Sequence, residues 1–235
     1  MQTVFVCGGR GSRLTPRSVG PKSLVPIGGS SLLAHLVHRI GRCHTSDAPP
    51  VVIVDDQDAE TPLVVDVLLP RACVVRQARP DGVANALLLA QPFLDDVVVV
   101  ALGDLFLDGE VAGLTREPAL VFWREAPPAE TRKNFGVTIK SDGSVSAVIE
   151  KPVHLFGLTC GMGIYVLTRS AIACFRHAPV DARTGERGIT AAIQTAIDRG
   201  IVFRSVPFSG FYNNVNSPSD VASVEGHLAQ AVRCV

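Results

Sequence analysis

Short runs of β-branched and other apolar residues recur along the chain, separated by segments rich in Gly, Pro and polar residues. Such runs are typical of buried strands. Between them, apolar residues fall at helical spacing, first after Ser31, a residue type that caps helices. The predicted strands are 3–7, 51–54, 73–76, 97–102, 119–123, 136–140, 145–149, 162–167 and 201–206, and the predicted helices are 32–40, 83–90 and 187–199.

The order of these elements predicts the fold class. Strands alternate with helices over the first hundred residues, which favours βαβ units and a mostly parallel sheet. Between residues 119 and 167 the strands follow one another closely, and Asp142-Gly143 is typical of a hairpin turn. A chain of 235 residues fits one domain. We therefore predict a single α/β domain with a mixed, mostly parallel central sheet and a small antiparallel extension.

Charge and hydropathy exclude several classes of partner. Lys+Arg and Asp+Glu both number 22, so the net charge is +0 and no overall field attracts nucleic acid or an anionic membrane. The apolar runs are much shorter than the roughly 18–20 residues that cross a bilayer, and no signal-peptide pattern opens the chain. The six cysteines show no metal-ligand spacing. We expect a cytoplasmic protein with free thiols, and no nucleic-acid or membrane partner.

A glycine-rich segment directly follows the first predicted strand. Gly8, Gly9 and Gly11 lie where open parallel sheets bind ligands, and three glycines in four positions let the backbone approach an anion. The segment is neither a dinucleotide fingerprint nor a Walker A motif, so a plain glycine-rich turn is the alternative. Downstream, Arg13 and Lys22 would add a planar fork and a point charge. Lys22 is one of only four lysines, against 18 arginines.

Segments 8–16 and 21–27 together resemble the signature of the sugar-1-phosphate nucleotidyltransferases, the family that includes glucose-1-phosphate thymidylyltransferase. The resemblance continues in order through residues 77–86, 102–104, 135–137, 150–152, 161–165 and 210–218. It therefore covers nearly the whole chain. It implies the Rossmann-like fold of nucleotide-diphospho-sugar transferases, as one domain over 1–235 with a nucleotide-binding half (1–115) and a sugar-phosphate-binding half (116–235).

The reaction that the resemblance implies is attack by a sugar-1-phosphate oxygen on the α-phosphorus of a nucleoside triphosphate, with release of pyrophosphate. A phosphate monoester with a second pKa of about 6 is already ionised at neutral pH, so no general base is needed. The enzyme has to align two polyanions and neutralise the charge that grows on the leaving group. A hard divalent cation, Mg²⁺ or Mn²⁺, is the implied cofactor.

The resemblance also implies roles for individual residues. Arg13 would stabilise the leaving pyrophosphate, Lys22 the reacting α-phosphate and Lys151 the sugar phosphate. The implied catalytic residues are Arg13, Lys22 and Asp104; the nucleotide-binding residues are Gly8, Gly9, Arg10, Gly11, Ser12, Gln77, Pro80 and Gly82; the sugar-phosphate-binding residues are Gly136, Glu150, Lys151 and Gly161; and the metal ligands are Asp104 and Asn214. For Asp104 the alternative is a cap or turn residue, and for Glu150 an ion pair with a neighbouring base.

Asn214 is the main departure from the family pattern, because an amide stands where the family has a second metal-binding aspartate. Its carbonyl oxygen can still bind a hard cation, but one negative charge is lost. Two alternatives therefore stay open: a noncatalytic regulatory paralogue that binds a nucleoside triphosphate or sugar nucleotide, and a glycosyltransferase of related fold. The glycosyltransferase is less favoured, because Gly103-Asp104-Leu105-Phe106 lacks an Asp-x-Asp metal motif.

The resemblance is less specific about the substrates. The segment from Gln77 to Ala84 looks more like the thymidylyl- and uridylyl-transferring branch than the guanylyl one, so dTTP or UTP is favoured over GTP. The acceptor would be a sugar-1-phosphate or a sugar-like cyclitol phosphate. The chain ends shortly after its last motif, so we expect no appended acyltransferase domain. The sequence does not fix an oligomeric state, and a homo-oligomer is one of the assemblies that it allows.

Overall fold

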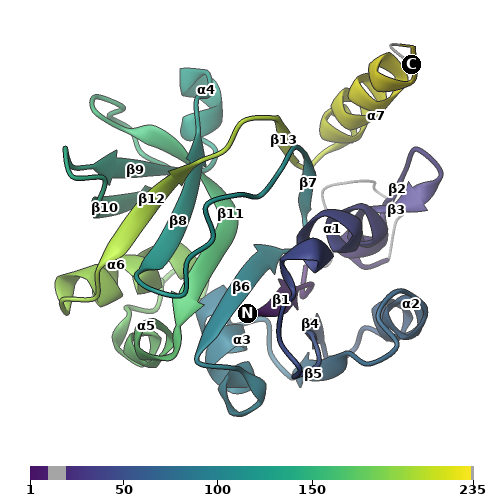
Figure 1. Ribbon diagram of the computed structural model, residues 1–235, viewed down its shortest axis with the longest axis horizontal. Coiled ribbons are helices and arrows are strands. Elements are labelled where there is room, and N and C mark those ends of the chain that lie inside the picture. The colour runs from purple at the N-terminus through teal and green to yellow at the C-terminus, as the bar shows by residue number, and fades with distance from the viewer. Residues whose placement is uncertain (10–19, 234–235) are drawn as a thin grey trace.

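The computed structural model describes residues 1–9 and 20–233, and its centre is a nine-stranded mixed sheet (Figure 1). Four strands are parallel, in the order β5-β4-β1-β6, and β11 pairs antiparallel with β6. Beyond β11 the sheet divides into β9-β10 and β8-β12. The strands are β1 (Gln2–Val6), β4 (Val51–Asp55), β5 (Cys73–Gln77), β6 (Val97–Leu102), β8 (Ala119–Arg124), β9 (Phe135–Ile139), β10 (Val145–Glu150), β11 (Thr159–Thr168) and β12 (Phe203–Pro207).

Helices cover both faces of the sheet, and strand β1 shows why. Its residues are all buried, and they alternate between the two faces. Val4 and Val6 belong to one apolar cluster, with residues of α3 (Val83–Ala90), α5 (Arg169–Cys174) and α6 (Ile189–Asp198). Phe5 belongs to another, with residues of α1 (Leu32–Ile40) and α2 (Glu60–Leu68). The molecule therefore has three layers, helix, sheet and helix, as Figure 1 shows from one side.

Two short antiparallel pairs and several small helices complete the fold. Strand β2 (Pro26–Ile27) pairs with β3 (Ser30–Ser31), and β7 (Leu105–Asp108) pairs with β13 (Phe211–Asn214). Ile27, Phe106 and Val224 belong to an apolar cluster that packs the last helix against these pairs. The remaining helices are α4 (Pro128–Thr131) and α7 (Pro218–Arg233), with the 3-10 helices η1 (Lys22–Leu24), η2 (Gly41–Cys43), η3 (Gln91–Phe93) and η4 (Phe175–His177).

The predicted fold class is confirmed, including the parallel sheet and its antiparallel extension. The β9-β10 hairpin turns at Asp142-Gly143 as expected, and Gly143 has the positive φ of 81° that such a turn requires. Helices α2, α5 and α7 and the β7-β13 pair were not predicted. Among the described residues no helix is both long and apolar enough to span a membrane. The five described cysteines are free, and Cys234 lies outside the described residues.

Candidate active site

The candidate site lies at the carboxyl ends of three parallel strands. Gly8 and Gly9 follow β1, Gln77 ends β5, and Gly103-Asp104 follows β6. The Gly103 N–H donates to the Val6 carbonyl at 2.8 Å, so the segments after β1 and β6 stay side by side. Because parallel strands end at one edge of a sheet, these residues meet although they are far apart in the sequence.

A pocket of about 220 Å³ opens at this edge. Seven of the residues predicted for catalysis or nucleotide binding line it: Gly8, Gly9, Lys22, Gln77, Pro80, Gly82 and Asp104. Its other lining residues are Val6, Cys7, Ser23, Val83, Leu102, Gly103 and Glu186. The remaining predictions for this part of the chain, Arg10, Gly11, Ser12 and Arg13, lie outside the described residues.

Lys22 places a cation in the pocket wall. It begins the 3-10 helix η1, and its backbone N–H donates to the Gly9 carbonyl at 2.9 Å, which ties the helix to the glycine segment. Its Nζ donates to Asp104 Oδ2 at 2.7 Å and to Asn216 Oδ1 at 2.5 Å. Only 12% of the Lys22 side chain is exposed. The ammonium is therefore held between two oxygens from different loops and lines the pocket.

Asp104 divides its two carboxylate oxygens between two environments. Oδ2 accepts from Lys22, whereas Oδ1 is buried and has no hydrogen-bond partner within residues 1–9 and 20–233. The backbone carbonyl of Asp104 accepts from the Val215 N–H at 2.8 Å, and β7 and β13 pair immediately beside it. This pairing places Asn214 opposite Leu105, the neighbour of Asp104.

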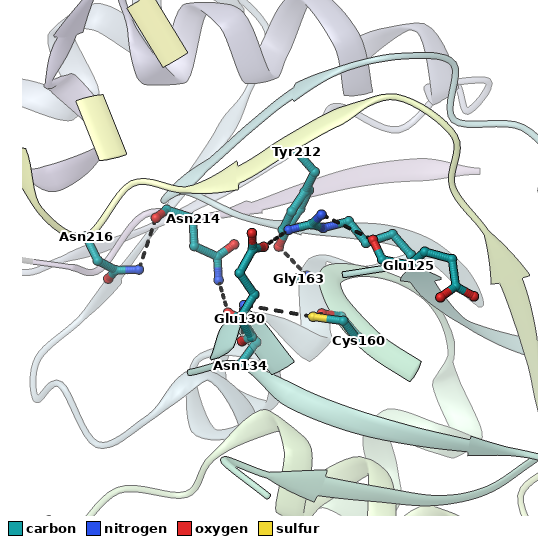
Figure 2. A network of polar contacts seen from close by, with 10 residues as sticks. Glu125, Glu130, Asn134, Cys160, Gly163, Tyr212, Asn214 and Asn216 are labelled. Atoms are coloured by element: carbon teal, nitrogen blue, oxygen red, sulfur yellow. Dashed lines mark hydrogen bonds and ion pairs between the residues drawn. The ribbon is translucent and has the colours of Figure 1, made fainter. Parts of the chain in front are cut away.

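Asn214 has its amide orientation fixed by a neighbouring amide (Figure 2). Its Nδ2 donates to Asn134 Oδ1 at 2.6 Å. Its Oδ1 is buried, and like Asp104 Oδ1 it lacks a hydrogen-bond partner in the described part of the chain. A buried polar oxygen without a partner is costly in the absence of a ligand.

These two oxygens fit a hard divalent cation, which prefers carboxylate and amide oxygens. They come from residues that the β7-β13 pairing brings next to each other. Among the described residues, no group of three or more His, Cys, Asp and Glu side chains is placed to hold a metal ion. A cation at Asp104 and Asn214 would therefore have to complete its shell with water and substrate phosphates, as Mg²⁺ usually does.

Gln77 presents an acceptor to the pocket. Its Nε2 donates to Asp81 Oδ1 at 2.6 Å and to the Gly82 carbonyl at 3.3 Å. Both partners are acceptors only, so they fix which end of the amide is the NH₂ group. Oε1 therefore lies on the opposite side, 3.6 Å from the position that a Cβ on Gly8 would occupy. A base with an N–H donor on its edge is the complementary ligand.

Gly82 is required by the backbone at this wall of the pocket. Its φ is 105°, and an added Cβ would lie 2.3 Å from the Arg187 carbonyl oxygen. The Arg187 N–H donates to the Asp81 carbonyl at 2.7 Å, and the Arg187 carbonyl accepts from the Ala84 N–H at 3.1 Å. Arg187 thus joins segment 181–187 to residues 81–84, which explains why Glu186 lines the pocket.

Cys7 lies in the pocket wall, where a nucleophile could stand, but its chemistry excludes that role. Burial, together with the nearby Asp58 carboxylate, raises the pKa of its thiol to about 12. The thiolate is the reactive form, and at neutral pH this group is a neutral thiol. Cys7 therefore acts as a small apolar side chain that supports the glycine segment.

The predicted sugar-phosphate residues do not line the pocket. The side chains of Glu150 and Lys151 are 57% and 65% exposed, and Lys151 Nζ lies 3.9 Å from Glu150 Oε1. Glu150 Oε2 also accepts a hydrogen bond from Thr190 Oγ1 at 2.7 Å. The ion pair considered for Glu150 is therefore present. Gly136 and Gly161 are buried, and an added Cβ would lie 2.7 Å from the Leu158 side chain and 2.1 Å from the Phe135 ring. Both glycines make room for packing.

Sequence reasoning missed three residues that the structure brings to this site. Glu186 lines the pocket, Asn216 holds Lys22, and Asn134 holds Asn214. Asn216 lay inside a motif that carried a signal, two residues after the predicted metal ligand. Asn134 and Glu186 reach the site through tertiary packing and carry no comparable signal in the sequence.

Comparisons with known proteins show the family of the chain. The family model described as nucleotidyl transferase matches residues 2–230. The bifunctional protein GlmU of Methanocaldococcus jannaschii is 25% identical over 99% of this chain and 55% of its own length. A glucose-1-phosphate thymidylyltransferase of Streptomyces griseus is 30% identical over 95% of this chain and 65% of its own. The chain therefore spans 55% to 65% of the length of these two relatives.

Solved structures share the fold. A UDP-glucose pyrophosphorylase complexed with UDP-glucose superposes with a TM-score of 0.80 at 16% identity, covering 98% of both chains. An inositol-1-phosphate CTP transferase from T. maritima gives 0.79 at 14% identity, covering 96% of this chain and 94% of that one. The family match over residues 2–230 shows that the chain belongs to the nucleotidyl transferase family, that of the sugar-1-phosphate nucleotidyltransferases.

Proposed function

We propose that the protein transfers a nucleotidyl group from a nucleoside triphosphate to a sugar-1-phosphate and releases pyrophosphate. The observation that carries this proposal is the position of the Lys22 ammonium in a pocket wall built from Gly8, Gly9, Gln77 and Gly82. Backbone N–H groups and a held cation are what a polyphosphate requires. Family membership and the relatives named as thymidylyltransferases support the same class of reaction.

The residues of the chain would act by alignment and charge neutralisation. Lys22 would contact the reacting α-phosphate, and Arg13 would contact the leaving pyrophosphate. No side chain has to remove a proton, because the sugar phosphate is already ionised. Mg²⁺ bound by Asp104 and Asn214 would supply further neutralisation of the triphosphate. Lys151 and Glu150, at the end of β10, would bind the phosphate and a hydroxyl of the acceptor.

The base and the acceptor are proposed as classes of compound. The Gln77 acceptor is complementary to the N3–H of uracil or thymine, which supports UTP or dTTP as the donor, with GTP as a further candidate. The relatives named glucose-1-phosphate thymidylyltransferase support a hexose 1-phosphate as acceptor. A cyclitol phosphate offers the same phosphate and hydroxyl groups and belongs in the same test.

Pyrophosphate release over a grid of substrates tests the proposal. The purified protein with Mg²⁺ is assayed with each of dTTP, UTP, CTP, GTP and ATP against a panel of sugar 1-phosphates and cyclitol phosphates. We expect release from at least one pair, with a pyrimidine nucleotide as the best donor. Triphosphate binding without release from any pair would instead support the noncatalytic paralogue.

A further inference from the structure

Two asparagines from distant parts of the chain form a direct amide–amide contact at the predicted metal site (Figure 2). Asn134 lies between α4 and β9, and Asn214 ends β13, 80 residues later. Their contact, from Asn214 Nδ2 to Asn134 Oδ1, is 2.6 Å long. Both asparagines are half-buried, and their contact joins the segment before β9 to β13, the strand that ends in the predicted metal ligand Asn214.

The direction of this hydrogen bond is fixed from one end. Asn134 Nδ2 donates to the Glu130 carbonyl at 3.1 Å, and a backbone carbonyl can only accept. Asn134 therefore has to present Oδ1 to its other neighbour, and Asn214 has to donate through Nδ2. It follows that the oxygen of Asn214 points away from Asn134, where it is buried and has no partner within the described residues.

This orientation matters because the ligand is an amide. The two oxygens of an aspartate are equivalent, so an aspartate can rotate and still offer an oxygen to a cation. An asparagine rotated by half a turn would offer an NH₂ group, which a cation repels. An asparagine at a metal position therefore needs a partner that holds its amide, and Asn134 has the geometry of that partner.

We propose that Asn134 is a positioning residue that directs Asn214 Oδ1 toward the divalent cation bound by Asp104 Oδ1. This inference rests on the proposed function. Asn134 itself touches neither cation nor substrate in this scheme. Its contact lets Asn214 act as a metal ligand where the family has an aspartate. It also links cation binding to the loop that precedes β9.

A double-mutant cycle on Mn²⁺ binding tests the proposal without requiring turnover. Free Mn²⁺ is measured by electron paramagnetic resonance in titrations of the full chain with Mn²⁺ alone. We expect Asn134→Ala to weaken Mn²⁺ binding about tenfold, as the loss of a residue that orients a metal ligand does. In a chain carrying Asn214→Asp, the same change should leave Mn²⁺ affinity unaltered or raise it, because a carboxylate needs no orientation.

Each outcome decides the matter. An equal loss of affinity in both backgrounds would mean that Asn134 only supports the loop, and no loss in either would remove its role. Absence of Mn²⁺ binding by the parent chain would also overturn the inference, whereas the pyrophosphate assay judges the proposed reaction separately. Asn213→Ala, which removes the neighbouring amide of β13, is the matched control and should leave Mn²⁺ affinity unchanged. Thermal unfolding of each variant checks that it is folded.

Discussion

At the scale of single residues, the site depends on which atom of each side chain is already engaged. Lys22 contacts Asp104 Oδ2, and Asp81 contacts the NH₂ group of Gln77, so among the described residues Asp104 Oδ1 and Gln77 Oε1 stay available to a ligand. In both cases a hydrogen bond within the protein determines which atom of Asp104 or Gln77 remains for a ligand. This division of donors and acceptors makes the site specific in geometry as well as in composition.

Removing the Lys22 ammonium should damage catalysis more than stability. We expect Lys22→Met to lower kcat/KM for pyrophosphate release by about 100-fold or more, because a preorganised charge at the reacting phosphate is lost. Steady-state kinetics on the best substrate pair measures this effect. Lys140→Met, which removes an exposed lysine next to the β9-β10 turn, is the control and should retain parental kinetics. Parental kinetics in Lys22→Met would contradict the role given to this residue.

Asp81 should control the choice of base although it does not line the pocket. In Asp81→Ala the NH₂ group of Gln77 loses its carboxylate acceptor at 2.6 Å and keeps only the longer hydrogen bond to the Gly82 carbonyl at 3.3 Å, so the amide turns round more easily. We expect the preference for UTP over CTP, measured as a ratio of kcat/KM values, to fall by about tenfold, the equivalent of roughly one hydrogen bond. Asp56→Ala is the control: it removes an exposed carboxylate just after β4, the neighbour of β5, and should leave that ratio unchanged. An unchanged ratio in Asp81→Ala would show that Gln77 is oriented by other contacts.

Much of the candidate site could be predicted at this scale, for a physical reason. Gly8, Gly9 and Asp104 each follow a parallel strand, Gln77 ends another, and parallel strands bring their carboxyl ends together. Asn134 could not be predicted, because its role depends on a contact across 80 residues of sequence. Local sequence carries no information about which amide will meet another.

At the scale of elements, the docking of α7 is tied to one carboxylate. Asp108, at the end of β7, forms an ion pair with Arg39 of α1 and a hydrogen bond with His227 of α7, whose Nε2 lies 2.9 Å from Asp108 Oδ2. The His227 ring also stacks on Phe211 of β13 at a centroid distance of 4.0 Å. Asp108 thus joins the first and the last helix to the strand pair that carries the site.

The pH dependence of stability should report this link. The hydrogen bond from His227, with the charge of Arg39, holds the pKa of Asp108 below its usual value of 3.8. A carboxyl group whose pKa is lower in the folded than in the unfolded protein stabilises the fold at pH values above the unfolded-state pKa. That contribution is lost as the pH falls through the folded-state pKa. We expect Asp108→Asn to lower the free energy of unfolding by about 1 kcal/mol at pH 7. The difference from the parent should shrink below pH 3.8.

Urea unfolding at pH 7 and at pH 3 measures both effects. Asp66→Asn, which changes an exposed carboxylate on α2, is the control and should follow the parent at both pH values. A difference between Asp108→Asn and the parent that grows as the pH falls would contradict the interpretation.

Element prediction succeeded where local pattern and tertiary environment coincide. Strand β6 is apolar throughout, β1 and β4 each contain an unbroken apolar run, and the apolar stripe of α1 follows helical spacing. Helix α2 was missed because Leu63 and Val67 face solvent and obscure its periodicity. Strands β7 and β13 have four residues each and pair across about a hundred residues of chain, so no local signal marks them as partners.

At the scale of the whole molecule, the two predicted halves share one core. A single apolar cluster contains Val4 and Val100 from the first half and Tyr165, Ile193 and Phe203 from the second. Strands β6 and β11 pair directly across the division, with five residues of each in register. The boundary predicted near residue 115 therefore does not separate two cores.

We therefore expect the protein to unfold as one unit. Calorimetry should give one transition whose van't Hoff enthalpy equals the calorimetric enthalpy, because neither half can keep its apolar surface buried without the other. Intrinsic fluorescence of the lone Trp123, in the second half, should follow the same transition as far-UV circular dichroism. Two separated transitions would contradict a shared core.

We also expect the amide at position 214 to change how the binding of a cation and the binding of a nucleotide depend on each other. Among the described residues, Asp104 and Asn214 together bring one formal negative charge to the predicted cation site, and the ammonium of Lys22 offsets it. A triphosphate would add negative charge, so a divalent ion that binds the chain alone should bind more tightly when the triphosphate is present. The two ligands should therefore bind with strong positive thermodynamic linkage, each raising the affinity of the other by the same factor.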